Sequence, residues 1–435
     1  MRKWLLPLFL FITVSGFSQL SDAYKELKDF SQKKEIVPLD SSIELTIYYK
    51  KSLHYLYPLY KAFYQEDRLL KIDTGLYIDN LSQALSLTGD HASVLALEKI
   101  YRPKLPPFSK KEIDTLTSTP GEFSYTDAKK YILNRAKNSR VVMINEAHDK
   151  PQHRAFTASL LEELYQQGFR YLAMEMLSNR RRIPITKPDL YSGYYTAEPI
   201  AGELIRKAVE LGYTLVPYED TIPNHSLNQR EYAQARNLFN FLKQHDSTAK
   251  MVVHAGYGHI ENTAQSSARI PMAVNFKNMT GIDPLTIDQT QMTENSVNNY
   301  GAFVYDIWMQ RHPANTSVIA LSDNKPFDVF GLDLYDICVI HPPAKYINAR
   351  PAWVTMNGWK KELTVPAAFR SAFLLQAYYA DEYTVATVNQ SVPADQTYQV
   401  AANGLYYLYL RKGKYKLVFR DKAYEILGTK DIEVN

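Results

Sequence analysis

The 435-residue sequence has a single cysteine, Cys338, so no disulfide bond can form within the chain. It has no G-x-S-x-G elbow and no cysteine in a catalytic setting, which disfavours hydrolysis through a serine or cysteine nucleophile. Phosphate-loop and dinucleotide-binding fingerprints are missing as well. The formal net charge of +4 is small for this length, so composition gives no argument for a nucleic-acid partner.

Long apolar runs are also missing, except near the start of the sequence. A basic pair precedes an apolar stretch from Trp4 to Val14, and small residues precede an expected cleavage before Gln19. Residues 1–18 therefore predict a signal peptide. The apolar stretch is shorter than a typical transmembrane helix, and no lipid-bearing cysteine lies near the cleavage point. We expect a bacterial periplasmic or secreted protein, without disulfides and without a transmembrane anchor after cleavage.

The middle of the chain predicts a strand, a helix and a second strand. Residues 141–144 form a continuous apolar run, which suits a strand buried on both faces. Polar residues follow at once, among them Glu146 and His148. After an amphipathic helical segment, the second apolar run, 171–174, ends at Glu175 in the same way. This pattern is typical of a βαβ unit with polar side chains at the carboxyl ends of its strands.

The same pattern occurs twice more downstream. Residues 213–219 predict a third strand that ends at Glu219, and residues 251–260 predict a fourth. The fourth strand carries His254 near its end and His259 after a glycine-containing turn. Ligands bind at the carboxyl ends of parallel strands, so these side chains predict one site at that edge. The predicted site comprises Glu146, His148, Glu175, Glu219, His254 and His259.

Three motifs carry a resemblance to a known group of proteins. They are NEAHDKPQH at 145–153, MEM at 174–176 and HAGYGHIEN at 254–262. They resemble motifs of the superfamily that contains erythromycin esterases, ChaN-type haem-binding proteins and Tiki/TraB proteins. The resemblance covers roughly residues 135–290. One departure is Asn145, which stands where the superfamily usually has glycine.

The resemblance implies a hydrolase that uses Glu and His to activate water. His148 would be the general base, Glu146 and Glu175 would position it, and His259 would stabilise or ligate. An ester, a lactone or a peptide bond would suit this chemistry, so the expected partner is a small-molecule or peptide substrate. Carboxylates and imidazoles also suit a divalent metal ion. The candidate metal ligands are Glu146, Glu175, Glu219, His254 and His259.

Two alternatives to hydrolysis stay open. ChaN-type proteins bind haem, and the Tyr- and Arg-rich loop 178–199 offers Tyr191 and Tyr194 as phenolate ligands. This loop has no clear helical or strand period, and a solvated basic loop explains it as well as a lid over the site does. The other alternative is a structural or interaction protein, in which the helical N-terminal part and the β-rich C-terminal part contact partners and the central site is vestigial.

The sequence divides into regions of different character. We expect a helical region at 19–125, an α/β core with a mostly parallel sheet flanked by helices at 126–345, and a small β-rich region at 346–435. The predicted site lies entirely within the α/β core.

Overall fold

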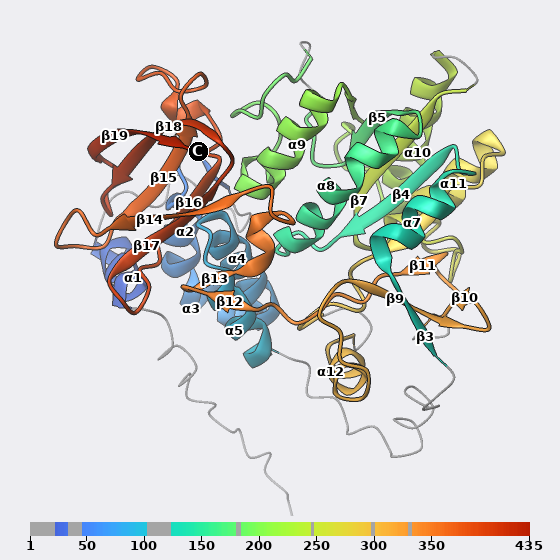
Figure 1. The fold of residues 1–435 in the computed structure, drawn as a ribbon, viewed down its shortest axis with the longest axis horizontal. Coiled ribbons are helices and arrows are strands. Elements are labelled where there is room, and N and C mark those ends of the chain that lie inside the picture. The colour runs from blue at the N-terminus through green and yellow to red at the C-terminus, as the bar shows by residue number, and fades with distance from the viewer. Residues whose placement is uncertain are drawn as a thin grey trace, which may run out of the picture.

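A computed structural model describes residues 22–33, 46–101, 123–179, 184–244, 248–296, 301–328 and 333–435. The fold is mixed α/β, as predicted. Figure 1 shows two parts side by side: a parallel sheet with its helices, and the N-terminal helices beside the C-terminal strands. The expected signal peptide, 1–18, lies outside the described residues. Among the described helices, none combines the length and the apolar character needed to cross a membrane.

The six-stranded sheet has the order β11-β8-β4-β7-β5-β6, and all of its neighbouring strands are parallel. Its strands are β4 (Val141–Glu146), β5 (Phe169–Met174), β6 (Thr214–Pro217), β7 (Lys250–Gly256), β8 (Leu285–Asp288) and β11 (Ile337–Cys338). The helices around it are α7 (Ala128–Ala136), α8 (Pro151–Gln166), α9 (Pro199–Leu211), α10 (Leu227–Gln244), α11 (Met272–Thr280) and α12 (Gly301–Arg311). Because the strands are parallel, their carboxyl ends share one edge.

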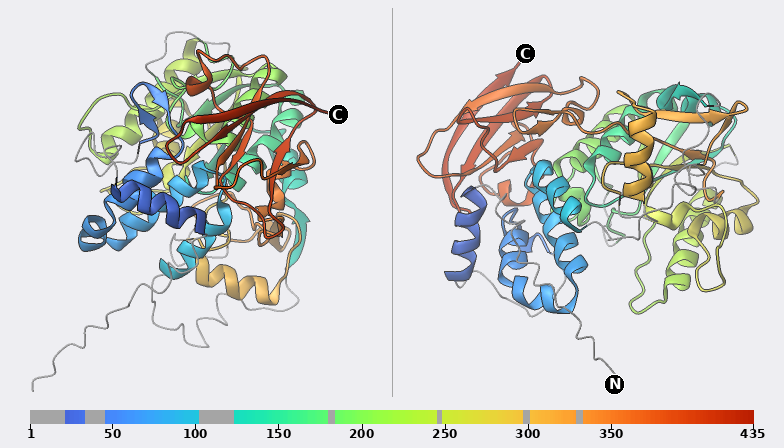
Figure 2. Two further views of the ribbon diagram at one scale, coloured as in Figure 1. Left: turned by 90° about the vertical axis from the view of Figure 1, so that its left-hand side faces the viewer. Right: turned by 90° about the horizontal axis from the view of Figure 1, so that it is seen from below.

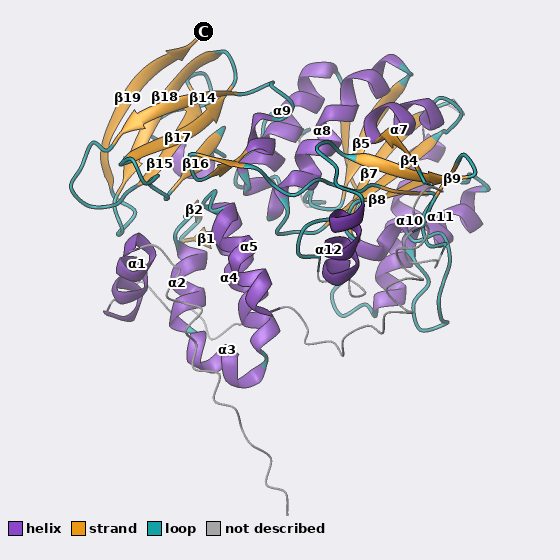
Figure 3. Cartoon of the chain, turned by 60° about the horizontal axis from the view of Figure 1, so that its bottom comes forward, coloured by secondary structure: helices purple, strands orange, loops and turns teal. Residues whose placement is uncertain are grey.

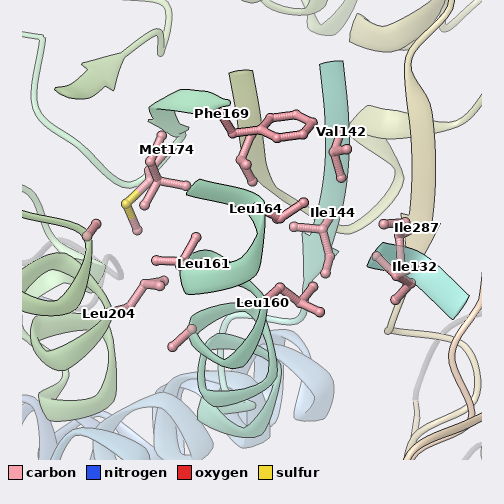
Figure 4. Close-up of a cluster of buried hydrophobic side chains, with 14 of the residues drawn as sticks. Ile132, Val142, Ile144, Leu160, Leu161, Leu164, Phe169, Met174, Leu204 and Ile287 are labelled. Carbon is pink, nitrogen blue, oxygen red and sulfur yellow. The ribbon is translucent and has the colours of Figure 1, made fainter. Parts of the chain in front are cut away.

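The central strand β4 is buried on both faces, which explains its uninterrupted apolar run. Val142 and Ile144 point to the face covered by α7, α8 and α9, and Figure 4 shows them packed beside Leu160 and Leu164. The alternate residues of β4 join a second cluster with side chains of α10 and α11. Side chains alternate between the faces of a strand, so each face has its own apolar core.

The helices of this part begin and end at the residues that helix chemistry favours. Pro151 occupies the first turn of α8, where its missing N–H leaves no bond unmade. Glu198 precedes α9 and accepts hydrogen bonds from two backbone N–H groups of its first turn, at 2.8 and 2.9 Å. Gly212 ends α9 with φ +92°, a left-handed conformation that favours glycine.

The second part combines the two ends of the sequence. Its helices are α1 (Asp22–Lys33), α2 (Tyr57–Tyr64), α3 (Glu66–Ile72), α4 (Thr74–Leu87) and α5 (His91–Tyr101). Its main strands are β14 (Lys361–Pro366), β15 (Leu374–Tyr379), β16 (Asp395–Thr397), β17 (Leu405–Leu410), β18 (Gly413–Arg420) and β19 (Ile426–Val434). They form a β16-β15-β18-β19 sheet and a β14-β17 pair. Figure 3 shows the helices beneath these strands.

The two ends share one apolar core, although more than 250 residues separate them. Tyr24 and Leu81 belong to the same buried cluster as Leu374 and Tyr398, and Figure 2 shows the N-terminal helices against the C-terminal strands. Gly89 lies so close to the C-terminal region that an added Cβ would meet a backbone oxygen at 2.3 Å. The predicted helical and β-rich regions therefore form one packed unit.

Short strands complete the fold. They are β1 (Tyr48–Tyr49), β2 (Ser52–Leu53), β3 (Ser124–Asp127), β9 (Val318–Ser322), β10 (Lys325–Pro326), β12 (Tyr346–Ile347) and β13 (Arg350–Pro351). Of the apolar runs 318–321 and 337–340, only the second contributes to the central sheet, through β11, because β9 pairs with β3 and β10 in a separate three-stranded sheet.

Candidate functional site

An open cleft of about 700 Å³ lies at the carboxyl edge of the parallel sheet. It is centred on the ends of β4, β5 and β7, three neighbouring strands. The structure brings all six predicted side chains to its wall: Glu146, His148, Glu175, Glu219, His254 and His259.

Glu146 is the most deeply buried carboxylate of the cleft, with 2% of its surface exposed. Arg154 donates two hydrogen bonds to its carboxylate, at 2.7 and 3.0 Å. The same carboxylate also accepts from Nδ1 of His148 at 3.3 Å and from Nε2 of His254 at 2.7 Å. Because a carboxylate only accepts, each of these ring nitrogens carries a hydrogen. In the tautomer that donates from Nδ1, the Nε2 atom of His148 carries the lone pair.

The charge of Glu146 is stabilised by these partners. Burial alone would raise its pKa, but Arg154, His254 and the hydrogen bond from His148 together hold the pKa well below its usual range. Arg154 is itself buried between Glu146 and Glu198, which lies at 3.3 Å. Arg154 also donates to the backbone oxygen of His148 at 2.8 Å, so it fixes the loop that carries the imidazole.

His254 supports Glu146 from inside the sheet. Its side chain is 1% exposed, and its other ring nitrogen lies 3.3 Å from the hydroxyl of Thr157 on α8. Both nitrogens therefore have partners within the protein. His148 differs, because 22% of its side chain is exposed.

A second group of charges lies across the cleft around Arg230 of α10. The guanidinium donates to Oε1 of Glu175 at 2.6 Å and makes two hydrogen bonds to Glu219. The side chain of Arg230 is 34% exposed, and it provides the one arginine or lysine among the described cleft-lining residues. Burial alone would raise the pKa of Glu175, but His259, His148 and Arg230 lower it, so this carboxylate is also charged.

His259 connects Arg230 to a buried acid, Glu231. Its Nδ1 donates to Glu231 at 2.8 Å, and its Nε2 accepts from Arg230 at 3.0 Å. Burial lowers the pKa of His259, but Glu231 and Glu175 outweigh it and raise the pKa above its ordinary value. Protonation of Nε2 would require Arg230 to turn away and would direct the new N–H toward Glu175, 3.7 Å from it.

Gly256, the last residue of β7, lets the two groups of charges approach each other. A Cβ at this position would lie 2.6 Å from Cε1 of His148, 3.0 Å from its Nε2 and 3.2 Å from Oε2 of Glu175. Only a residue without a side chain allows this approach. The next residue, Tyr257, has φ +42° and packs its ring edge-on against His148 at 5.0 Å. Strained backbone of this kind is often found at functional sites.

Loop 178–199 forms one wall of the cleft. Residues 180–183 lie outside the described part, but Ser178, Gly193, Tyr194 and Tyr195 line the cleft. Tyr195 stacks on the imidazole of His148, with ring centroids 4.4 Å apart and planes 15° from parallel. Tyr191 is 60% exposed and is not among the residues that line the cleft.

The N-terminal part of the chain also reaches the site. Tyr48 of the β1–β2 hairpin lines the cleft and contacts the ring of Tyr194 edge-on at 6.4 Å. Lys150, two residues after His148, forms a buried ion pair with Glu98 of α5 at 2.5 Å. The loop after β4 is therefore held by the helical region as well as by its own sheet.

Sequence reasoning missed Arg154, Tyr195, Arg230 and Glu231 as parts of the site. Two signals were available for Arg154 and Arg230. Arg154 lies one turn into the helix that follows the Glu146 strand, and Arg230 lies in the helix that follows the Glu219 strand. Both positions are near the carboxyl edge of the sheet, where uncompensated acids need cations.

The residues of the cleft do not present a ready metal centre. Within the described part of the chain, no group of three or more His, Cys, Asp or Glu side chains is arranged to hold a metal ion. Guanidinium groups occupy the space between the acids, since Arg154 takes both oxygens of Glu146, and Arg230 bridges Glu175 and Glu219. The divalent-ion site stays a prediction.

Of the two tyrosines predicted as haem ligands, Tyr194 lies in the cleft and Tyr191 is not among its lining residues. The hydroxyl of Tyr194 is buried and has no hydrogen-bond partner among the described residues, and its ring lines the cleft. Burial, together with Tyr195 and Tyr48, raises its pKa well above the ordinary value. The raised pKa disfavours the deprotonated phenolate that would ligate haem. Haem binding stays a prediction.

Comparisons with known proteins give no family. No known protein family and no curated protein matches the sequence. Among solved structures, one described as bacterial protein toxins aligns over 65% of both chains, with 12% identity and a TM-score of 0.29. The RRSP effector domain of a MARTX toxin from Vibrio vulnificus CMCP6 aligns over 55% of this chain and 50% of that one, with 14% identity and a TM-score of 0.25. This chain thus covers less than two thirds of either structure, and both scores are too low to support a functional argument.

Proposed function

We propose that the protein is an exported hydrolase that activates water with Glu and His side chains and cleaves an ester, lactone or peptide bond. The main support is His148, a partly exposed imidazole that Glu146 orients from behind and that faces Glu175 across Gly256. This is the arrangement that general-base catalysis needs, with one nitrogen fixed and the other open to water.

In the proposed reaction, Nε2 of His148 takes a proton from water as the oxygen attacks the carbonyl carbon. The imidazolium that forms is stabilised by Glu146, which is already charged and already accepts from Nδ1. His148 then returns the proton to the leaving oxygen or nitrogen. Arg230, on the other side of the cleft, supplies positive charge for the oxyanion that develops, and His259 adds to it only when its Nε2 is protonated.

The test is hydrolysis of a panel of ester, lactone and peptide substrates by purified protein and its variants. His148→Ala is expected to lower kcat roughly a hundred-fold or more and to cost about 1 kcal/mol of stability. Glu146→Gln should reproduce the kinetic loss, and the double variant should lose little more if the pair acts as one unit.

His225 provides a matched control. Its side chain is 24% exposed, close to the 22% of His148, and its Nδ1 also contacts an acid, Asp220. It does not line the cleft. His225→Ala should therefore keep full activity, and equal losses in the two histidine variants would overturn the assignment of His148 as base. No turnover of any substrate, with a new visible absorption band on adding haem, would favour the haem-binding alternative.

A further inference from the structure

A second cleft, of about 580 Å³, lies between the β1–β2 hairpin and the turn that follows β18. The hairpin separates it from the cleft described above, since Tyr48 lines the first and Tyr49 lines the second. Its wall is rich in aromatic and basic side chains. They include Lys50, His54, Arg420 and Tyr424, and the acidic Glu425 lies beside them.

Arg420 lies at the inner wall of this cleft and is 2% exposed. Its three nitrogens donate to neutral oxygens only. The acceptors are the amide oxygens of Gln376 at 2.7 Å and Asn389 at 2.6 Å, and the backbone oxygen of Tyr424 at 3.0 Å. A buried charge is costly unless an opposite charge compensates for it.

The other deeply buried arginines of the described chain all have that compensation. Arg154, Arg206 and Arg350 each lie within 3.0 Å of a carboxylate oxygen. Arg420 has no Asp or Glu oxygen within 4.0 Å among the described residues. It is therefore the exception: besides its neutral oxygen acceptors, its guanidinium carbon lies 4.1 Å from the centre of the Tyr424 ring, and no carboxylate of the described chain compensates for its charge.

Three further side chains line the cleft together with Arg420: His54, Lys50 and Glu425. His54 stacks on the ring of Tyr424 at 3.9 Å, and its buried Nδ1 has no hydrogen-bond partner in the described part of the protein. Burial, followed by the charge of Arg420, lowers the pKa of His54 to about 3, so the imidazole is neutral. Lys50 stands exposed on the turn of the hairpin, and Glu425, exposed at the rim, is the one acidic side chain among the described lining residues.

We propose that this cleft binds the oxyanion of a small ligand, a carboxylate or a phosphate, with Arg420 as the buried counter-charge and Lys50 at the entrance. Charge-assisted hydrogen bonds of this kind are stronger than those between neutral groups. The binding site is separate from the proposed hydrolytic cleft, and the proposal does not depend on catalysis.

Calorimetric titration of the full chain with inorganic phosphate and with acetate, at constant ionic strength, tests the proposal. The wild type should bind at least one of the two anions, and Lys50→Gln should weaken that binding about five- to ten-fold. Lys51→Gln is the matched control, because Lys51 is the other residue of the same turn and does not line the cleft. It should leave the affinity unchanged.

Arg420→Met should abolish the binding. Failure of the wild type to bind either anion would overturn the proposal, as would full binding by Arg420→Met or equal losses in the two lysine variants. If Arg420→Met does not fold, the two lysine variants decide the question alone. Preference for phosphate or for acetate then identifies which oxyanion the cleft accepts.

Discussion

The two sides of the main cleft use the same residue types in different ways. On one side, the Glu146 group consists of Glu146, His148 and Arg154. On the other, the Glu175 group consists of Glu175, His259 and Arg230. In the first, the arginine is 1% exposed and fixed between two carboxylates; in the second, it is 34% exposed.

Because of this difference, the Glu146 group is held in one arrangement, whereas the Glu175 group can rearrange. The first arginine holds both an acid and the backbone next to the imidazole, so that group has one arrangement. The second contacts the Nε2 atom that His259 would use to take a proton, so that group can rearrange when His259 changes charge. The first group suits a positioned base, and the second suits the stabilisation of changing charge on a substrate.

The largest difference is expected when each arginine is removed. Arg154→Met leaves Glu146 and Glu198 buried without their cation, and we expect a loss of about 3–5 kcal/mol in the free energy of unfolding. Arg230→Met removes the cation from Glu175 and Glu219, which water already reaches in the open cleft. The loss in the free energy of unfolding should therefore stay within about 1 kcal/mol. Urea denaturation of both variants gives the comparison. Equal losses would mean that the Glu175 group is as rigid as the Glu146 group.

The next largest effect is expected at the point where the two groups meet. Gly256→Ala would place a methyl group against the His148 ring and shift it, so we expect a loss in kcat/KM on the order of a hundred-fold. Gly258→Ala is the control, since the atoms nearest to its methyl would be the flexible side-chain ends of Glu261 and Arg269. Full activity in Gly256→Ala would show that the close approach of the two groups is not needed for catalysis.

A smaller effect is expected from the aromatic wall. Tyr195→Leu removes the ring stacked on His148, and a stacked pair contributes about 0.5–1.5 kcal/mol beyond its buried area. We expect kcat/KM to fall several-fold, with little change in the global stability. Tyr191→Leu, on the same loop but outside the cleft, should have no kinetic effect. A loss of equal size in both variants would point to the loop as a whole rather than to the stacked ring.

The smallest expected effect is a difference in pH dependence between the two groups. The lowered pKa of Glu146 gives stability that is present above the ordinary glutamate pKa and is lost as the pH falls. The raised pKa of His259 gives stability that is present below the ordinary histidine pKa and is lost as the pH rises through the raised value.

Urea midpoints measured between pH 2 and 9 check both signs, because the Glu146 contribution is lost only below the ordinary glutamate pKa. His259→Gln should flatten the decline on the alkaline side and leave the decline on the acid side in place. If the variant keeps the alkaline decline, another group is responsible for it, and the assigned role of Glu231 in raising the pKa of His259 is wrong.

Much of the core could be predicted from local pattern. The apolar run 141–144 indicated a strand buried on both faces. The helix after it indicated that the next strand runs parallel to the first. Once the strands are parallel, their carboxyl ends must share an edge, and the acids and histidines that follow them must meet. Within the central sheet the prediction omitted β8 (Leu285–Asp288), since four residues without alternation carry too little signal to separate a strand from a loop.

The sequence by itself therefore determined the parallel core and the position of the six strand-end residues. Tertiary structure alone decided how they are partnered. Arg154 could have paired with any nearby acid, and Tyr195 and Tyr48 reach the cleft only because distant segments pack together. The contact between the N-terminal helices and the C-terminal strands was equally invisible, since local periodicity indicates which face of an element is apolar but not which distant face will cover it.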